Sequence, residues 1–333
     1  MSADNFKAMV VSEKEDKKYI REITNRTIND LPEGDVLINV KYSSLNYKDA
    51  LSAIGNRGVT KNYPHTPGVD AAGVVEHSDS HDFKTGDEVI THGYDIGMDT
   101  SGGFGQYVRV PAEWVLRLPI GLTLKESMAY GTAGFTAAQS IYRLVENGIN
   151  PGSGKILVTG ATGGVGSMAV AILFKAGYKV TASTGKADQN DFLKNLGASE
   201  IISREDATDQ TGRLLLKGQW DGVVDTVGGE ILATALKSTM QRGVVTTCGN
   251  VASHDLNTNV YPFILRGVSL IGIDSAGCPM DRRVKIWEKL SSDWKVDKFD
   301  QISRTVSLEE LDPEIDKILE GGQVGRVVVD LWS

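Results

Sequence analysis

The sequence predicts an α/β protein in which a doubly wound parallel sheet is combined with a smaller β-barrel domain. Three observations carry this prediction. Short strands separated by Gly and Pro fill residues 6–125, strand and helix alternate from about residue 126, and the C-terminal segment ends in a strand that the parallel sheet does not need. We therefore expect a first domain over residues 1–125, completed by residues 300–333, and a second domain over residues 126–299.

The strand candidates of the first domain are short and closely spaced. Residues 35–45 alternate in polarity, residues 67–77 form a β-branched stretch behind a Pro-Gly pair, and residues 86–93 begin with a Gly-Asp turn. Residues 102–119 supply two further candidates. Short strands at this spacing, with Gly and Pro between them, indicate a partly closed β-barrel.

The second domain is expected to begin with a helix over residues 126–146, where apolar residues recur at helical spacing. A continuous apolar strand follows, as parallel sheets covered on both faces require. Strands then alternate with helical stretches, of which residues 205–218 form the weakest, and the C-terminal strand is expected to return to the first domain. The six parallel strands are expected at residues 155–161, 179–184, 200–204, 222–227, 243–249 and 269–275.

Composition and charge limit the class of protein. The 333 residues are 41% apolar and 23% charged, which is ordinary for a soluble globular protein. The net charge of −8 argues against nucleic acid or an anionic membrane as the main partner. The two cysteines, Cys248 and Cys278, lie too far apart for a zinc cluster, so we expect no metal site. No basic and apolar leader and no run of about eighteen apolar residues is present, so a cytoplasmic protein is expected.

A glycine-rich turn, KILVTGATGGVGSMAV over residues 155–170, lies between an apolar strand and an apolar helix. Glycines in such a turn let backbone N–H groups approach a pyrophosphate, which binds at the positive end of the helix. Ala161 takes the first position of the usual G-x-G-x-x-G pattern, so the strand–turn–helix setting is what predicts a Rossmann dinucleotide site. The alternative is a tight structural turn. The candidate cofactor contacts are Thr162, Gly163, Gly164, Val165 and Gly166.

The end of the next strand, KVTASTGK over residues 179–186, lacks the acidic residue that binds the ribose 2′-hydroxyl in NAD-binding units. The chain instead offers Ser183, Thr184, Gly185 and Lys186, and Arg204 follows the neighbouring strand. Hydroxyls and cations can bind a 2′-phosphate by charge-assisted hydrogen bonds, so the strand end predicts NADPH as cofactor. The alternative is that Lys186 and Arg204 are solvated surface charges.

Seven segments together make the chain similar to the medium-chain dehydrogenase/reductase family, in its zinc-free quinone-oxidoreductase branch and closest to the acryloyl-CoA reductase type. They read SSLNYKDAL, PGVDAAGVV, GGFGQYV, GTAGFTA, VTGATGGVGS, YPFILRGVSLIGIDS and GRVVVD, and they span nearly the whole chain. The resemblance implies a GroES-like barrel, a Rossmann domain and an active site in the cleft between them. Zinc-dependent members carry a Cys within the segment that reads LNYKDA here and a Gly-His-Glu where this chain has Gly68-Val69-Asp70.

The resemblance also implies roles for single residues. Tyr47 is the lead catalytic candidate, as a hydrogen-bond donor to a developing oxyanion, with packing against the nicotinamide as the alternative. Asn46 is expected either to orient the nicotinamide carboxamide or the substrate carbonyl, or to cap a helix that opens at Lys48. Asp49 and Asp70 are expected to form structural hydrogen bonds near the cleft. Further cofactor contacts are expected at Thr132, Asn250, Ile264, Ser275 and Arg326, the last toward a cofactor phosphate or a CoA group unless it is a surface cation.

Three functions are compatible with these features. The first is NADPH-dependent reduction of an activated C=C bond in acryloyl-CoA or another short 2-enoyl-CoA, and the second is reduction of a quinone or an enone by the same fold. The third, from another class, is a nucleotide-binding sensor without catalysis. A CoA thioester would favour a basic mouth, for which Arg57, Lys61, Arg282 and Arg283 are candidates. The apolar edge strand SLIGIDSA needs a cover, so we expect a homodimer.

Overall fold

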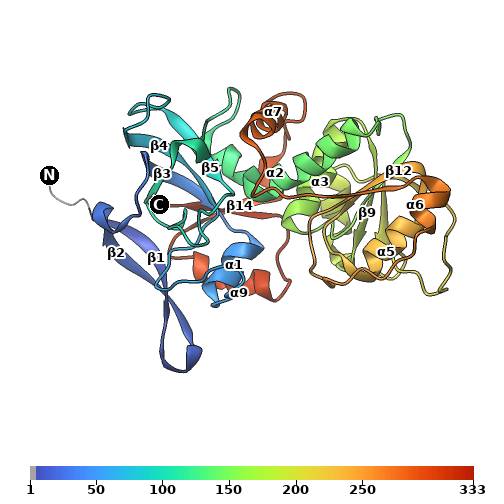
Figure 1. Cartoon of the computed structure of the whole chain (residues 1–333), viewed down its shortest axis with the longest axis horizontal. Coiled ribbons are helices and arrows are strands. Elements are labelled where there is room, and N and C mark those ends of the chain that lie inside the picture. The colour runs from blue at the N-terminus through green and yellow to red at the C-terminus, as the bar shows by residue number, and fades with distance from the viewer. Residues whose placement is uncertain (1–4) are drawn as a thin grey trace. The chain divides into compact units, whose positions relative to one another are not determined.

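The computed structural model describes residues 5–333 and divides into two compact units, each with its own sheet (Figure 1). Unit 1 comprises the described residues up to Thr132 together with Ala276–Lys285 and Phe299–Ser333. Unit 2 comprises Ala133–Ser275 and Ile286–Lys298. The predicted fold class, a Rossmann sheet plus a GroES-like barrel, is confirmed.

Unit 1 is built on a seven-stranded sheet in the order β14-β15-β3-β4-β5-β7, with β6 paired to β3, beside a separate β1–β2 hairpin. The predicted return of the C-terminal strand is confirmed, because β15 pairs antiparallel with β3 and places Val328 opposite Ser44. The strands are β1 Asn5–Glu13, β2 Tyr19–Thr27, β3 Val36–Ser44, β4 Asp70–Ser78, β5 Glu88–His92, β6 Tyr107–Val110, β7 Val115–Arg117, β14 Ser303–Ser307 and β15 Arg326–Asp330. The helices are α1 Tyr47–Ala53, α8 Phe299–Ile302 and α9 Leu311–Leu319.

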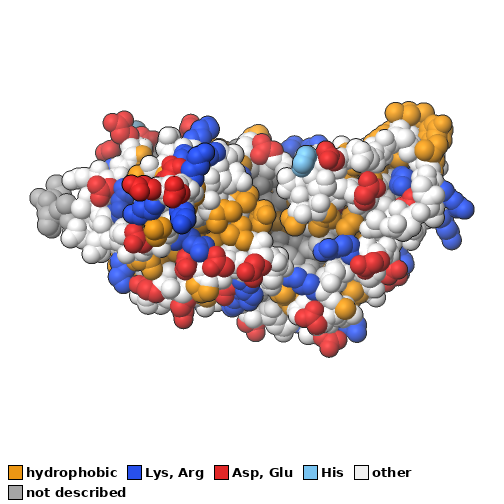
Figure 2. All heavy atoms as spheres, turned by 90° about the horizontal axis from the view of Figure 1, so that it is seen from below, with side chains coloured by type: hydrophobic (Ala, Val, Ile, Leu, Met, Phe, Trp, Pro, Cys, Tyr) orange, Lys and Arg blue, Asp and Glu red, His pale blue; other side chains and the backbone are white. Residues whose placement is uncertain are grey.

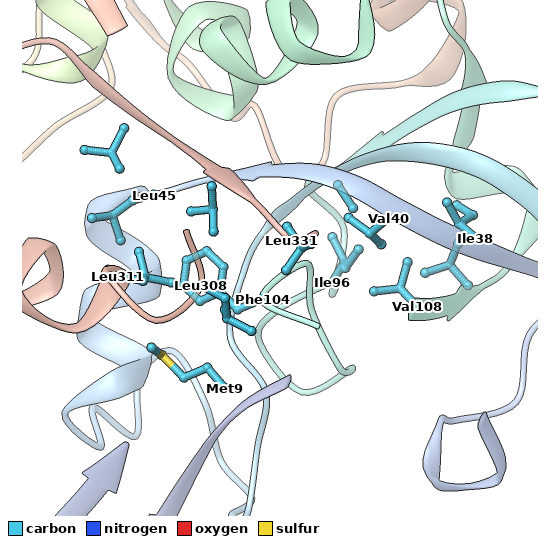
Figure 3. Close-up of a cluster of buried hydrophobic side chains, with 14 of the residues drawn as sticks. Met9, Ile38, Val40, Leu45, Ile96, Phe104, Val108, Leu308, Leu311 and Leu331 are labelled. Atoms are coloured by element: carbon cyan, nitrogen blue, oxygen red, sulfur yellow. The ribbon is translucent and has the colours of Figure 1, made fainter. Parts of the chain in front are cut away.

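The core of unit 1 joins segments from both ends of the chain (Figure 3). Ile38 and Val40 from β3 lie in the same cluster as Leu308 and Leu331, and each of these side chains is at most 3% exposed. Burial of such side chains contributes about 1.5–3 kcal/mol each, so the C-terminal segment is an integral part of the barrel.

Unit 2 is a six-stranded parallel sheet in the order β10-β9-β8-β11-β12-β13, with helices on both faces (Figure 1). This is the doubly wound order, in which the chain changes direction between β8 and β11 and leaves a ligand crevice at the carboxyl ends of the strands. All six predicted strands are present. Their bounds are β8 Lys155–Val158, β9 Lys179–Thr184, β10 Glu200–Ser203, β11 Trp220–Asp225, β12 Thr239–Thr247 and β13 Ser269–Gly272.

The helices of unit 2 follow the prediction with one exception. They are α3 Gly164–Lys175, α4 Asn190–Asn195, α5 Gly229–Ser238 and α6 Tyr261–Arg266, while α2 Leu124–Glu146 and α7 Met280–Ser291 cross a unit boundary. The prediction of a helix over residues 205–218 is wrong, since this stretch forms turns. Asp209 accepts hydrogen bonds from the Thr211 backbone N–H and hydroxyl, and local bonds of this kind compete with a helix.

Candidate functional site

The predicted site residues form two groups, one in each unit, and each group is built on the ends of strands. The cofactor candidates from Thr162 to Ser275 belong to unit 2, and Asn46, Tyr47, Thr132 and Arg326 belong to unit 1.

The glycine-rich loop has the backbone that a pyrophosphate site requires. Helix α3 begins at Gly164 with Gly163 as its N-cap, directly after β8 and the turn at Gly160, where φ is +58°. A Cβ at Gly166 would overlap the carbonyl oxygen of Gly160 and approach the Cα of Ala161 to 2.7 Å, so only glycine lets the helix pack this closely on the strand. The free N–H groups of the first turn and the helix dipole fit an anionic diphosphate.

The two hydroxyl residues at the end of β9 are turned into the protein. Ser183 is 2% exposed and its Oγ donates to the Ser203 carbonyl at 3.5 Å. Thr184 is 7% exposed, and its Oγ1 accepts the Lys186 backbone N–H at 3.0 Å while lying 3.2 Å from the Thr162 hydroxyl. In this geometry the two hydroxyls shape the turn, and their contact with a 2′-phosphate stays a prediction.

The two predicted cations lie at the same strand end. Ser203 pairs with Thr184 in the parallel ladder, so Arg204 emerges directly beside the β9 turn. A Cβ at Gly185 would lie 3.0–3.2 Å from the Arg204 guanidinium, which therefore covers this glycine closely. Gly185 and Arg204 are exposed and Lys186 is half-buried. The strand end thus combines two positive charges with no acidic residue from Lys179 to Lys186.

A buried carboxylate in unit 2 braces the neighbouring strand ends, and the sequence interpretation did not single it out. Asp225, at the end of β11, accepts the hydroxyls of Thr159 at 2.8 Å and Thr247 at 2.9 Å. It also accepts the N–H groups of Val227 and Gly228. Burial raises the pKa of Asp225, and the hydroxyl and amide donors oppose that rise. An acidic residue that directly follows a buried β-branched strand was the available signal.

Tyr47 is the first residue of α1 and is exposed, whereas the N-cap Asn46 is buried. The Tyr47 side chain is 41% exposed and Asn46 is 8% exposed. Among residues 5–333, no hydrogen-bond partner is found for the Tyr47 hydroxyl, which leaves it accessible to a ligand. Helix α1 begins one residue before the predicted start at Lys48, because Asp49 Oδ2 accepts the Asn46 backbone N–H at 2.8 Å.

The Asn46 amide is bound within a buried charged network. Its Nδ2 donates to Asp70 Oδ2 at 2.7 Å, and its Oδ1 accepts from Arg326 Nη1 at 3.2 Å. The Asp70 carboxylate also accepts the Thr132 backbone N–H at 2.9 Å and hydroxyl at 2.6 Å, and the Ser44 hydroxyl at 2.5 Å. Asn46 therefore has the position of a cap and a network member, which was the alternative to direct substrate contact.

Arg326 differs from the expectation that it faces a phosphate or solvent. It is 2% exposed, and its guanidinium donates to the carbonyls of Ala129 and Leu45 and to the Ser44 hydroxyl. Its Nη2 lies 3.9 Å from Asp70 Oδ2. Burial lowers the pKa of Arg326 and the neighbouring aspartates oppose this, so the group stays a cation. The surface-cation alternative is wrong, since the side chain is enclosed by the barrel.

Asp49 is a second buried carboxyl beside the same network. Its Oδ1 accepts the Val69 backbone N–H at 2.8 Å. Burial, and then the charge of Asp70, raises the pKa of Asp49 to about 7. The expected structural role of Asp49 and Asp70 agrees with these contacts.

The remaining cofactor candidates follow the later strands of unit 2 or lie on helix α6. Asn250 follows β12 and is exposed, Ser275 follows β13 and is half-buried, and Ile264 lies on α6 with 67% of its surface exposed.

Of the residues suggested for a basic mouth, Arg283 is buried and donates to the His92 carbonyl at 2.7 Å. Arg57 is paired with Glu13 at 2.5 Å.

The described residues form neither a cluster of metal ligands nor a membrane-spanning helix. Among residues 5–333, no group of three or more His, Cys, Asp and Glu side chains is placed to hold a metal ion. In the same range, no helix has both the length and the apolar character of a membrane span. The cytoplasmic location stays a prediction.

Comparison with known proteins agrees with this architecture. Residues 32–120 match the family model of the alcohol dehydrogenase GroES-like domain, and residues 164–292 match that of the zinc-binding dehydrogenases. The YhfP protein of Bacillus subtilis, whose name assigns it provisionally to the quinone oxidoreductases, is 48% identical over 98% of this chain and 99% of its own. Its crystal structure with NAD bound superimposes with a TM-score of 0.96, covering 98% of this chain and 100% of that one.

Two further relatives carry other names. The acrylyl-CoA reductase AcuI of Ruegeria pomeroyi is 41% identical over 98% of this chain and 99% of its own. The structure of Escherichia coli YhdH with bound NADPH is 39% identical, covers 97% of this chain and 99% of that one, and gives a TM-score of 0.93. The chain therefore belongs to the zinc-free branch of the medium-chain dehydrogenase/reductase family, among oxidoreductases of the quinone oxidoreductase and acrylyl-CoA reductase type.

Proposed function

We propose that the protein is an NADPH-dependent reductase of an activated C=C bond, with acryloyl-CoA or another short 2-enoyl-CoA as substrate. The single observation that carries the cofactor choice is the end of β9, where the Arg204 guanidinium covers Gly185, Lys186 follows directly and no carboxylate is present. The names of the AcuI relative and the NADPH bound to YhdH support the same reading.

The cofactor and the protein contribute different parts of the proposed reaction. Bound NADPH supplies a hydride to the β-carbon of the enoyl thioester. The C=C electron pair moves toward the thioester carbonyl, and a proton must reach the α-carbon to give the saturated product. The exposed Tyr47 phenol donates a hydrogen bond to the enolate oxygen while it carries the negative charge, since a phenol can donate without ionising. Loss of one such donor costs about 10²–10³ in kcat.

The substrate class is tested by following NADPH oxidation with acryloyl-CoA, crotonyl-CoA and a benzoquinone side by side. We expect kcat/KM for acryloyl-CoA to exceed that for the quinone by at least about tenfold, because an enoyl thioester places a carbonyl where Tyr47 can stabilise it. Equal or better turnover of the quinone would contradict the proposal. A quinone is the second candidate because of the name of the YhfP relative.

The cofactor preference is tested with Lys186→Ala and Arg204→Ala. A cation that binds a 2′-phosphate interacts with NADPH but not with NADH, so we expect KM for NADPH to rise about tenfold or more and KM for NADH to change less than about threefold. Lys179→Ala, at the other end of β9, is the matched control and should leave both constants unchanged. An equal loss for both cofactors would remove the 2′-phosphate from the proposal.

We also propose that the protein is a homodimer formed through the β13 edge of unit 2. Strand β13 is the last strand of the sheet, so one side of its backbone has no neighbouring strand within the described chain. Hydrophobic side chains gather at the right-hand end of Figure 2, where Figure 1 places α6. The exposed apolar residues of this region are Val260, Tyr261, Ile264 and Leu265, with exposed fractions from 39% to 67%.

The dimer is tested by light scattering coupled to size-exclusion chromatography. Ile264→Glu and Leu265→Glu place charges in the apolar surface and should shift the protein toward monomer at micromolar concentration. Phe174→Glu, which changes an exposed apolar residue on α3, is the matched control and should leave the oligomeric state unchanged. A wild type that runs as a monomer would contradict the proposal.

A further inference from the structure

Asn46 lies between a buried cation and a buried anion, and this arrangement fixes which way its amide points. The Arg326 Nη1 donates to Asn46 Oδ1 at 3.2 Å, so the amide oxygen must face the guanidinium. The Asn46 Nδ2 group then faces Asp70 Oδ2 at 2.7 Å. Reversal of the amide would set donor against donor at Arg326 and acceptor against acceptor at Asp70, so a single orientation is selected.

The same cation holds the chain on the N-terminal side of Tyr47. Arg326 Nη1 also donates to the Leu45 carbonyl at 2.9 Å, and the Leu45 N–H donates to the Val327 carbonyl at 3.0 Å. Leu45 is thereby attached to β15 through both its N–H and its carbonyl, and Asn46 through its side chain. Tyr47 follows them directly as the first residue of α1, so its Cα position depends on these bonds while its phenol stays exposed.

Helix α2 is interrupted at the point where it contacts the Arg326–Asp70 pair. Helix α2 breaks at Gly131, whose φ of +51° and ψ of −158° are open only to glycine. A Cβ at Gly131 would overlap Ser44 Oγ, Asp70 Oδ2 and Arg326 Nη2. Burying two opposite charges adds little net stability, because desolvation offsets their attraction. A buried pair that requires a broken helix and lies next to an exposed phenol indicates a role in placing that phenol.

We propose that Arg326, with Asp70 as its counter-charge, is a positioning residue for Tyr47 and does not bind a cofactor phosphate. The inference rests on the role proposed above for Tyr47 in catalysis. The donors of the guanidinium are directed at Ala129, Leu45, Asn46 and Ser44, all within unit 1. Loss of the guanidinium therefore displaces the start of α1, and misplacement of a catalytic group by about 1 Å can cost about 100-fold in rate.

The test is a double-mutant cycle of Arg326→Met and Tyr47→Phe, read by steady-state kinetics and by fluorescence titration of NADPH. We expect Tyr47→Phe to lower kcat about 100-fold and Arg326→Met about 30-fold. In the Tyr47→Phe background, Arg326→Met should lower kcat less than about threefold, since residues that act as a unit are non-additive. The Kd for NADPH should stay within about threefold in every variant.

Two results would overturn the proposal. If Arg326→Met costs as much without the Tyr47 hydroxyl as with it, Arg326 does not act through Tyr47. If the Kd for NADPH rises tenfold or more while kcat is kept, Arg326 is a cofactor ligand. Should Arg326→Met fail to fold, Arg326→Lys keeps the charge but cannot bridge Leu45 and Asn46, and it should lower kcat by about fivefold.

Further variants and acceptors distinguish a failure of this inference from a failure of the proposed function. Arg304→Met, on the adjacent strand β14, breaks the ion pair with Glu314 and should lower stability without changing kcat. If the wild type does not reduce acryloyl-CoA, the proposed substrate fails, and the cycle is then measured with the acceptor that is reduced. If Tyr47→Phe keeps full kcat with that acceptor, the role of Tyr47 fails and this inference fails with it, whichever substrate is turned over.

Discussion

Each unit contains a carboxylate that is fully buried at the end of a strand, and the two are satisfied in different ways. Asp70 in unit 1 faces a guanidinium at 3.9 Å and accepts from Asn46, Ser44 and Thr132. Asp225 in unit 2 accepts from two threonine hydroxyls and from backbone N–H groups, and no cation contacts it in the described chain. Both have a relative exposure of 0%.

The two carboxylates differ in whether the groups that donate to them can also turn and act as acceptors. Both carboxylates accept two hydroxyls, which can turn and accept where they previously donated. Only Asp70 also faces a guanidinium and an amide held in one orientation, and these two groups cannot do so. The Asp70 network therefore specifies one arrangement of charge and tolerates little change. The Asp225 network can accommodate a neutral side chain in place of the carboxylate. We expect the first to control geometry at Tyr47 and the second to brace the strand ends of the nucleotide loops.

The largest effect is expected for Asp70→Asn. The new amide would direct its NH2 group at either the Asn46 Nδ2 or the Thr132 N–H, and it would leave Arg326 without its nearest counter-charge. Breaking a buried ion pair on one side costs about 3–5 kcal/mol, so urea unfolding should show a loss in this range. The double variant Asp70→Asn/Arg326→Met should cost clearly less than the sum of the single variants. Additive losses would mean that the two groups are not coupled.

Gly131→Ala tests whether the fold must leave room for the pair. Its Cβ would overlap three atoms of the network at a φ of +51°, and we expect a loss of about 3 kcal/mol in thermal or urea unfolding. Gly148→Ala is the matched control, because φ there is also positive at +87° but nothing lies within 4 Å of the new Cβ. It should cost only about 1 kcal/mol. Equal losses would show that backbone strain alone, and not the network, sets the requirement for glycine.

These two regions also show what the sequence could and could not predict. The six strands of unit 2 and the glycine-rich turn were predictable because periodicity and turn chemistry are local properties. The network around Asp70 was predicted only as structural hydrogen bonds, since its cation comes from the other end of the chain and a β15–β3 pairing places it. The Asp225 contacts were missed because they depend on which strands are neighbours in the sheet.

The pH dependence of stability should report the buried carboxyl of Asp49 in unit 1. The folded pKa of Asp49 is raised to about 7, above the ordinary value near 3.9, so folding favours the protonated form. Its contribution is fully present below about pH 4 and is lost as pH rises through 7. We expect the unfolding free energy of the wild type, relative to Asp49→Asn, to fall by about 3 kcal/mol from pH 4.5 to pH 8. A flat difference between the two proteins would contradict the raised pKa.

The smallest loss in unfolding free energy is expected for Asp225→Asn in unit 2. With the amide oxygen in the place of Oδ2, the variant still accepts the Thr247 hydroxyl and the Gly228 N–H. Its NH2 group then faces the Thr159 hydroxyl, which already accepts the Thr226 N–H and can accept a second donor by turning. The remaining costs are the long Val227 contact of 3.4 Å and the Thr159 O–H, which loses its acceptor, so we expect about 2 kcal/mol in urea unfolding, less than the loss in Asp70→Asn. Asp225→Leu, which keeps the branched outline of the side chain but removes every acceptor, should cost about 3 kcal/mol and weaken NADPH binding because the strand ends lose their common anchor. If Asp225→Asn costs as much as Asp70→Asn, then the guanidinium and the held amide do not make the first network less tolerant, and the distinction between the two units is lost.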